Sequence, residues 1–178
     1  MGARPLMFRR RLARARSAIG RRGWALFPLR LLVGYGFASH GYAKLARGPA
    51  AFADILAAIG IPGALPAAWA TSLLELAGGI CIMLGAAVAS LAVPLAIIML
   101  TAMFGVHARY GFSSVRLKSV SPAGAVFGPV GFEVNLLYIT ALIALALGRS
   151  TPLSVDRWIE NSRRGRQDGE AHDDDRGR

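Results

Sequence analysis

Cysteine is nearly absent from this chain of 178 residues, and several motifs common in enzymes are absent altogether. The one cysteine, Cys81, cannot form an intramolecular disulfide, and its isolation excludes membrane thiol oxidoreductases, which pass electrons through paired cysteines. The sequence has no Walker loop, no His-x-x-x-His pair and no zinc-binding set of cysteines. The glycines of Gly34–Gly41 are not a dinucleotide fingerprint, because the third is misplaced and no strand precedes it. We interpret Cys81 as a packing residue and predict no metal site.

Acidic residues are also scarce, whereas long apolar runs are frequent. Between Trp24 and Gly148 the only acidic residues are Asp54, Glu75 and Glu133. The chain is 54% hydrophobic with a mean hydropathy of +0.44, which is more apolar than ordinary soluble domains. Four runs approach the length of about 20 residues that crosses a bilayer: Trp24–Leu45, Leu65–Gly85, Val88–Ala108 and Gly131–Gly148. They predict an all-α fold, an integral membrane four-helix bundle that forms one domain over residues 23–156.

The net charge of +11 is distributed in a way that favours a membrane over a nucleic acid as the partner. Residues 1–22 hold eight arginines and no acid, directly before the first apolar run. Cytoplasmic flanks of membrane helices carry such an excess, and the arginines would bind anionic lipid headgroups. We predict a retained basic cytoplasmic arm over residues 1–22, both termini in the cytoplasm, and no nucleic-acid binding. Residues 157–178 have few apolar side chains and are predicted to form a disordered cytoplasmic tail.

The segments between the runs predict how the helices are connected. The apolar residues of Pro49–Gly60 recur at a helical spacing, and the segment is too short to span a bilayer, so we place it flat on the outer surface. Only two or three residues near Ala86 separate the second run from the third, which predicts an antiparallel helical hairpin. The segment Arg109–Val130 is rich in Gly, Ser and Pro and is predicted to be an outer loop. Arg30 lies near the cytoplasmic end of the first run, where its side chain can snorkel to the headgroups.

Five ionisable residues fall in the outer half of the predicted bundle, at least one on each span. With about 1.5 Å of rise per residue, His40 lies roughly 7 Å outside the midplane, Lys44 one turn further out, and Glu75 near the midplane. His107 and Glu133 lie roughly 10–13 Å outside the midplane on the same scale. A charged side chain at the depth of Glu75 costs on the order of 3 kcal/mol or more, so its presence predicts a function or a specific partner.

Each of these residues also has a purely structural interpretation. His40 can bond to a neighbouring helix, Lys44 can snorkel outward, and Glu75 can lock the bundle by pairing with either of them. His107 is an ordinary residue at a membrane interface, and Glu133 is an ordinary charge at a helix N-terminus. The two histidines and two glutamates could also bind a metal, but their different depths do not favour a shared coordination sphere.

The order and spacing of several motifs resemble those of the DoxX family of small four-span bacterial membrane proteins. The motifs are Arg30 with Gly34-Tyr-Gly-Phe-Ala-Ser-His40-Gly41-Tyr-Ala-Lys44-Leu45, Gly60-Ile-Pro62, Glu75-Leu-Ala-Gly78-Gly79, Leu84-Gly85, His107, Gly131-Phe-Glu133-Val-Asn135, Gly148 and Ser154-Val-Asp156. The family is similar to the DoxD-type subunit of thiosulfate:quinone oxidoreductase, which implies membrane redox chemistry. It is also distantly similar to MauE-type proteins of methylamine oxidation and to membrane cargo receptors, which are not oxidoreductases.

The leading hypothesis is a multi-pass protein of the bacterial plasma membrane that serves as a subunit of a redox system and handles a quinone in the outer half of the bundle. Its carboxyl groups would exchange protons, since burial in lipid favours the neutral form of a carboxyl group, and its histidines would hydrogen-bond the quinone oxygens or relay protons. The predicted catalytic residues are Glu75, Glu133, His40 and His107. The predicted quinone-binding residues are His40, Lys44, Gly78 and Gly79, because small residues let a neighbouring helix or a flat ligand approach closely.

Two other functions stay open at this point. The chain has no cysteine pair, haem motif or flavin site, so a soluble or membrane redox partner would have to deliver electrons. The alternative is a non-enzymatic scaffold or assembly factor that anchors soluble partners through its basic arm and tail, with the polar cluster stiffening the bundle. A small-solute carrier is less favoured, because four spans without an internal repeat offer little for alternating access, although a homodimer would supply it.

Overall fold

The structure is a computed structural model that describes residues 4–148 and 151–163; within the first helix, side chains are described from residue 23 onward. Its elements in chain order are α1 (Arg4–Arg47), α2 (Pro49–Ala58), α3 (Ala64–Leu84), α4 (Val88–Ala102), the π-helical turn η1 (Met103–His107), the 3-10 turn η2 (Ala108–Tyr110), β1 (Leu117–Ser121), β2 (Gly124–Phe127) and α5 (Glu133–Leu147). The mostly helical character that the sequence predicts is therefore confirmed, and the structure adds one pair of strands.

The two ends of the chain are helical where the structure describes them. The basic arm predicted over residues 1–22 is, from Arg4 onward, the first half of α1. Residues 155–163 form a last helix, which includes the first residues of the tail predicted to be disordered. The rest of that tail, residues 164–178, lies outside the described residues.

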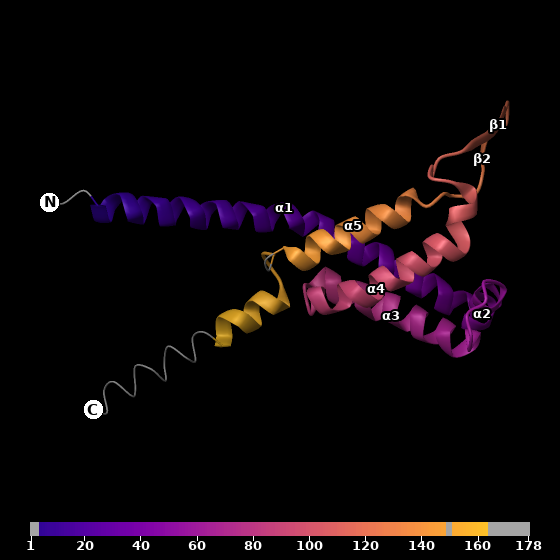
Figure 1. Cartoon of the computed structure of the whole chain (residues 1–178), viewed down its shortest axis with the longest axis horizontal. Coiled ribbons are helices and arrows are strands. Elements are labelled where there is room, and N and C mark those ends of the chain that lie inside the picture. The colour runs from indigo at the N-terminus through magenta and orange to yellow at the C-terminus, as the bar shows by residue number, and fades with distance from the viewer. Residues whose placement is uncertain (1–3, 149–150, 164–178) are drawn as a thin grey trace.

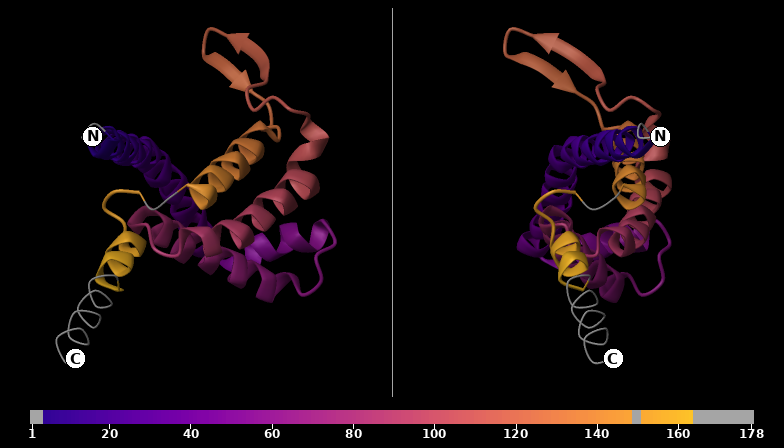
Figure 2. Two further views of the ribbon diagram at one scale, coloured as in Figure 1. Left: turned by 60° about the vertical axis from the view of Figure 1, so that its left-hand side comes forward. Right: turned by 90° about the vertical axis from the view of Figure 1, so that its left-hand side faces the viewer.

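Helices α1, α3, α4 and α5 pack in a ring. Helix α1 contacts α3, α3 contacts α4, α4 contacts α5, and α5 contacts α1. The right-hand view of Figure 2 looks down the axis of this ring. The first half of α1 and the last helix extend from one end of the ring, and α2 and the two strands lie at the other (Figure 1). Residues far apart in the sequence therefore share an end of the molecule.

Among the residues that the structure describes, two helices are long and apolar enough to cross a membrane. They are α3 and the continuous helix Val88–Tyr110, and they correspond to the second and third predicted spans. The turn between them is short, with Gly85 (φ 68°) and Ala87 (φ 52°) in the left-handed conformation, which confirms the predicted helical hairpin. The first predicted span, Trp24–Leu45, lies within α1, and the fourth, Gly131–Gly148, contains the 15 residues of α5.

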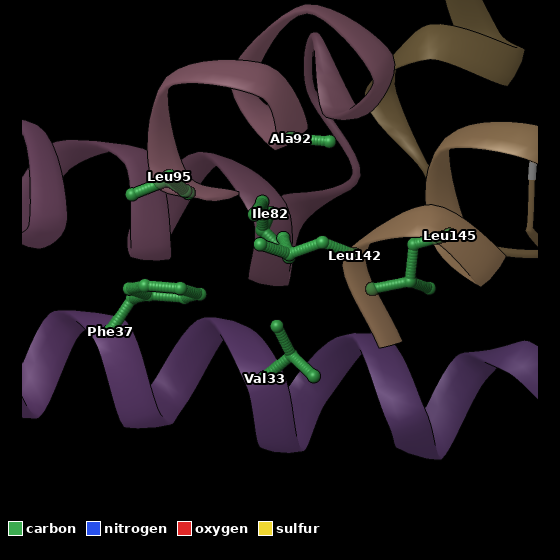
Figure 3. Close-up of a cluster of buried hydrophobic side chains, with 7 residues drawn as sticks. All are labelled: Val33, Phe37, Ile82, Ala92, Leu95, Leu142 and Leu145. Carbon is green, nitrogen blue, oxygen red and sulfur yellow. The ribbon is translucent and has the colours of Figure 1, made fainter. Parts of the chain in front are cut away.

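The core of the ring is a cluster of buried apolar side chains from all four helices. Helix α1 contributes Val33 and Phe37, α3 contributes Ile82, α4 contributes Ala92 and Leu95, and α5 contributes Leu142 and Leu145 (Figure 3). The ring of Phe37 also meets the ring of Tyr138 edge to face, with 5.3 Å between the centroids. Interdigitated packing of this kind fixes the four helices relative to one another.

The predicted short helix after the first span is confirmed as α2. It begins at Pro49, directly after Gly48, which has a positive φ of 87°. Proline is favoured at the first position of a helix, because its fixed φ is helical and its missing N–H needs no partner there. Ala53 and Leu56 of α2 pack against Ala68 of α3 in a second, smaller buried cluster. Helix α2 is therefore fastened to the start of α3 and covers that end of the bundle.

The segment Arg109–Val130, predicted to be a loop, contains an antiparallel β-hairpin. Strand β1 pairs with β2 so that Ser121 lies opposite Gly124 and Val120 opposite Ala125. The connecting sequence is Ser-Pro-Ala-Gly, which has proline and glycine where a tight turn favours them, and Gly124 has a φ of 121°. Both strands are exposed along their whole length, so the hairpin projects from the bundle (Figure 1).

Candidate functional site

Helices α1 and α3 approach each other closely because glycines line their contact. A Cβ atom placed on Gly34 would lie 2.6 Å from the carbonyl oxygen of Gly79, and one on Gly79 would lie 2.5 Å from the carbonyl oxygen of Gly34. Gly41 lies in the same way against the backbone of Ser72 and Leu76. Small residues allow such backbone-to-backbone packing of helices, and here it brings the end of α1 beside the middle of α3.

This approach places Lys44 of α1 against Glu75 of α3. The Nζ atom of Lys44 donates a hydrogen bond to Oε2 of Glu75 over 2.5 Å. The side chain of Glu75 is 1% exposed, whereas that of Lys44 is 22% exposed. The ammonium group also lies 4.5 Å from the ring centroid of Phe52 in α2, a cation–π arrangement. Of the two partners predicted for Glu75, the structure therefore shows Lys44.

His40 lies beside this ion pair but does not join it. Val33, Phe37, His40 and Lys44 follow one another at spacings of four, three and four, so they share one face of α1. The first two lie in the core, whereas His40 is exposed. Helices α1 and α5 cross and then diverge toward the end of the ring that carries α2 and the hairpin (Figures 1 and 2). In the described part of the chain, no hydrogen bond or ion pair links His40 to Glu75.

His107 and Glu133 both hold the backbone of the segment between η2 and α5. The Nδ1 atom of His107 lies 3.0 Å from the carbonyl oxygen of Val130. The carboxylate of Glu133 accepts a hydrogen bond of 3.0 Å from the backbone N–H of Ser114, and the Ser114 hydroxyl accepts one of 3.3 Å from the N–H of Val134. Neither residue is joined to the Lys44–Glu75 pair by a hydrogen bond or ion pair among the residues that the structure describes. Both side chains anchor the segment that carries the hairpin.

The two glycines predicted to admit a flat ligand face protein instead. The space in front of Gly79 is filled by the backbone of α1 at Ala38 and Gly34. A Cβ atom on Gly78 would lie 3.5 Å from a methyl group of Leu95, which is ordinary contact. These glycines therefore bring helices together.

The predicted acidic and histidine side chains do not gather around a common point. Within residues 4–148 and 151–163, no group of three or more His, Cys, Asp or Glu side chains is placed to hold a metal ion. Cys81 is a free, partly buried thiol on α3. The candidate site that geometry supports is therefore the Lys44–Glu75 pair, with His40 exposed one turn away on α1.

A second polar site, which the sequence did not predict, lies around Arg30 at the opposite end of the ring. The prediction that Arg30 snorkels to the headgroups is wrong, because its side chain is only 2% exposed. Its guanidinium group donates hydrogen bonds to the hydroxyl of Thr151, to the carbonyl oxygen of Pro152 over 3.5 Å and to that of Leu153 over 3.0 Å. These acceptors lie more than a hundred residues away in the chain. They bind the two terminal nitrogens of the guanidinium group, whereas its buried Nε atom has no hydrogen-bond partner among the described residues.

The same C-terminal segment, residues 151–156, also caps α4. The carboxylate of Asp156 accepts hydrogen bonds from the backbone N–H groups of Ala87 (2.9 Å) and Val88 (3.4 Å), and its own N–H donates to the carbonyl oxygen of Gly85 (3.0 Å). Helix α4 has no side-chain cap from its own N-cap residue, so Asp156 supplies the acceptor that a helix N-terminus needs. We call residues 151–156 the C-terminal clasp; a cavity of about 150 Å³ lies beside it, lined in part by Arg30 and Asp156.

We expect the variant Asp156→Ala to loosen the C-terminal clasp. The loss of a helix-capping acceptor costs about 1 kcal/mol, so the melting temperature in detergent should fall and the bond after Arg157 should become more sensitive to trypsin. Arg157→Gln changes the charge of the adjacent, exposed residue and serves as the control for stability. Identical melting temperatures for Asp156→Ala and the parent protein would show that the cap contributes nothing.

Comparison with known proteins relates the first part of this structure to a family. The DoxX family model matches residues 25–108, which run from α1 through α2, α3 and α4 to the start of η2. The matched part contains both members of the Lys44–Glu75 pair, whereas Glu133, the β-hairpin and the C-terminal clasp lie outside it. No curated protein and no solved structure gives a significant match.

Proposed function

We propose that this protein is a quinone-binding subunit of a membrane redox system. Its match to the DoxX family model over residues 25–108 supports membership of that family. The protein would lie in the bacterial plasma membrane and cross it four times. Its quinone would bind in the outer half of the bundle, against the Lys44–Glu75 pair. The observation that carries this proposal is the position of His40, exposed on the core-facing side of α1 and one turn from the buried pair.

The four-span arrangement rests on the contacts between the helices. Helices α3 and Val88–Tyr110 are long and apolar enough to cross a bilayer, and α1 and α5 pack alongside them in one ring. Helix α5 has 15 residues and so spans only about 22 Å, so the residues that flank it would complete the crossing. The arginines of residues 1–22 favour a cytoplasmic N-terminus, which places α2 and the hairpin outside.

The chemistry proposed for the pair is proton exchange. Reduction of a quinone to a quinol takes up two electrons and two protons. Lys44 would donate a hydrogen bond to a quinone oxygen from its exposed side, and the carboxylate of Glu75 would take up the two protons in turn and pass each one to the quinone. His40, on the same face of α1, would bind the second oxygen or replace the proton. The electrons would come from a partner protein, because these side chains carry protons only.

Glu75→Gln is the test of this role. It keeps the shape of the side chain and a hydrogen-bond acceptor for Lys44 but removes the exchangeable carboxyl proton. We expect the protein-dependent rate of quinol formation in membranes to fall on the order of a hundredfold. Asp54→Asn, which removes an exposed carboxylate of α2, is the matched control and should leave the rate unchanged.

A mass spectrum of the lipophilic molecules that co-purify with each variant separates binding from turnover. Quinone retained by Glu75→Gln together with a low rate would support a role in proton exchange. Equal rates of quinol formation for Glu75→Gln and the parent protein would contradict the proposal, whatever the variant binds.

A further inference from the structure

The β-hairpin is exposed on both of its faces. All residues of β1 and β2 are exposed, including Leu117, Val120, Val126 and Phe127. A two-stranded hairpin that stands alone is only marginally stable in water, and a contiguous group of exposed apolar side chains marks a surface that binds something. The geometry therefore calls for a surface that covers this hairpin.

The register of the strands gathers three of the four large apolar side chains on one face. Paired residues of an antiparallel ladder point to the same face, and successive residues point to opposite faces. The pair Val120–Ala125 thus lies on the face opposite to the pairs Ser119–Val126 and Ser121–Gly124. An irregularity between Leu117 and Ser119 places Leu117 opposite Phe127, so these two side chains join Val120 and Ala125. We call this group of four the apolar hairpin face; the other face carries both serines of β1 and Val126.

The charged side chains of the segment that carries the hairpin are all basic. Residues 109–130 contain Arg109, Arg116 and Lys118 and no acidic residue. The guanidinium group of Arg116 donates a 2.5 Å hydrogen bond to the carbonyl oxygen of Tyr110, and that of Arg109 lies 4.9 Å from the Tyr110 ring centroid. Both arginines are therefore held at the base of the hairpin, where the chain leaves the apolar helix Val88–Tyr110. A covering surface should offer apolar contacts and negative charge together.

We propose that the apolar hairpin face lies on the membrane surface, at the boundary between acyl chains and headgroups, with Arg116 and Lys118 at the phosphates of anionic lipids. The hairpin is attached at both ends to helices of the bundle, by residues 111–116 and 128–132, so it stays at that boundary. One apolar face combined with neighbouring cations is the pattern of an interfacial element, and each cation near an anionic surface adds to binding. A separate acidic protein would have to be recruited, whereas the lipid surface is already present.

A fluorescent label at two adjacent positions of β1 tests this placement. The chain has one cysteine, so Cys81→Ala provides a background in which Val120→Cys and Ser119→Cys can each carry an environment-sensitive fluorophore. The full-length protein is placed in vesicles of phosphatidylcholine with phosphatidylglycerol. We expect a blue shift and quenching by spin-labelled lipid for the label at Val120→Cys, and neither effect for the matched label at Ser119→Cys.

The charge dependence and the competing outcome are read from the same labels. Addition of Arg116→Gln and Lys118→Gln should reduce the quenching of the Val120→Cys label, and so should vesicles without phosphatidylglycerol. Equal exposure of the two labels to water in these vesicles would overturn the proposal. Protection of the Val120→Cys label in native membranes but not in lipid vesicles would also overturn it, because a protein would then cover the face. No quinone enters this experiment, so its result is independent of the redox role.

Discussion

The variant Gly79→Ala is expected to force α1 and α3 apart and to destabilise the bundle severely. A methyl group at this position would collide with the backbone nitrogen of Ala38 and lie 2.5 Å from the carbonyl oxygen of Gly34. Both are main-chain atoms of a continuous helix, so no side-chain rotation relieves the contact. Overpacking of this kind costs about 3 kcal/mol. Equilibrium unfolding in detergent, followed by circular dichroism, measures the loss.

The adjacent glycine provides the control. A methyl group on Gly78 would meet only the flexible side chains of Leu95 and Leu74, at 3.5 Å or more. Alanine also favours the helical conformation over glycine by up to about 1 kcal/mol, so Gly78→Ala should be neutral or slightly stabilising. If the two variants unfold at the same denaturant concentration, the close crossing of α1 and α3 does not hold the bundle together.

The same comparison explains what the glycine pattern could predict. The small residues Gly78 and Gly79 near Glu75 indicated that something approaches closely, but a neighbouring helix and a flat ligand need the same kind of space. The sequence could not distinguish them, because the choice depends on which turn of α1 faces which turn of α3. In the structure Gly34 and Gly79 face each other, and the helix occupies the space.

The need of Glu75 for a partner was easier to predict than the grouping of the five ionisable residues. Apolar periodicity and the position of Glu75 within an apolar run predicted a partner, and the structure shows Lys44. His107 and Glu133 were grouped with this pair by their expected depth, yet they bind backbone atoms of the segment beside the hairpin. Depth fixes one coordinate of a side chain, whereas its partner also depends on the rotation of its helix and on the loop beside it.

The clasp around Arg30 shows a second limit of the sequence. An arginine near the end of an apolar run normally reaches water, and nothing in the local sequence of α1 indicates otherwise. Its acceptors are a hydroxyl and two carbonyl groups of residues 151–153, and carbonyl groups are present in every residue. Only the return of the chain after α5 to the turn between α3 and α4 creates the site.

The variant Lys44→Met is expected to destabilise the protein strongly, because it leaves the buried Glu75 carboxylate without its partner. Glu75 is 1% exposed, so loss of the ammonium group strands a carboxylate inside the bundle, and such a loss costs about 3–5 kcal/mol. Glu75→Gln should cost less, because Lys44 is partly exposed and its ammonium group can turn toward water. Equilibrium unfolding of the single variants in detergent measures this asymmetry.

The double variant Lys44→Met with Glu75→Leu separates the energy of the pair from its function. Replacement of both charges by apolar side chains of similar size should restore most of the stability lost in Lys44→Met, since a buried ion pair and a well-packed apolar pair are often of similar stability. The double-mutant cycle then gives the coupling energy between the two residues. We expect the double variant to fold and to lose quinol formation, because the exchangeable carboxyl proton is gone. Quinol formation at the parent rate would show that the Lys44–Glu75 pair is structural only. A double variant no more stable than Lys44→Met would show instead that the ion pair itself, and not the stranded carboxylate, determines the stability.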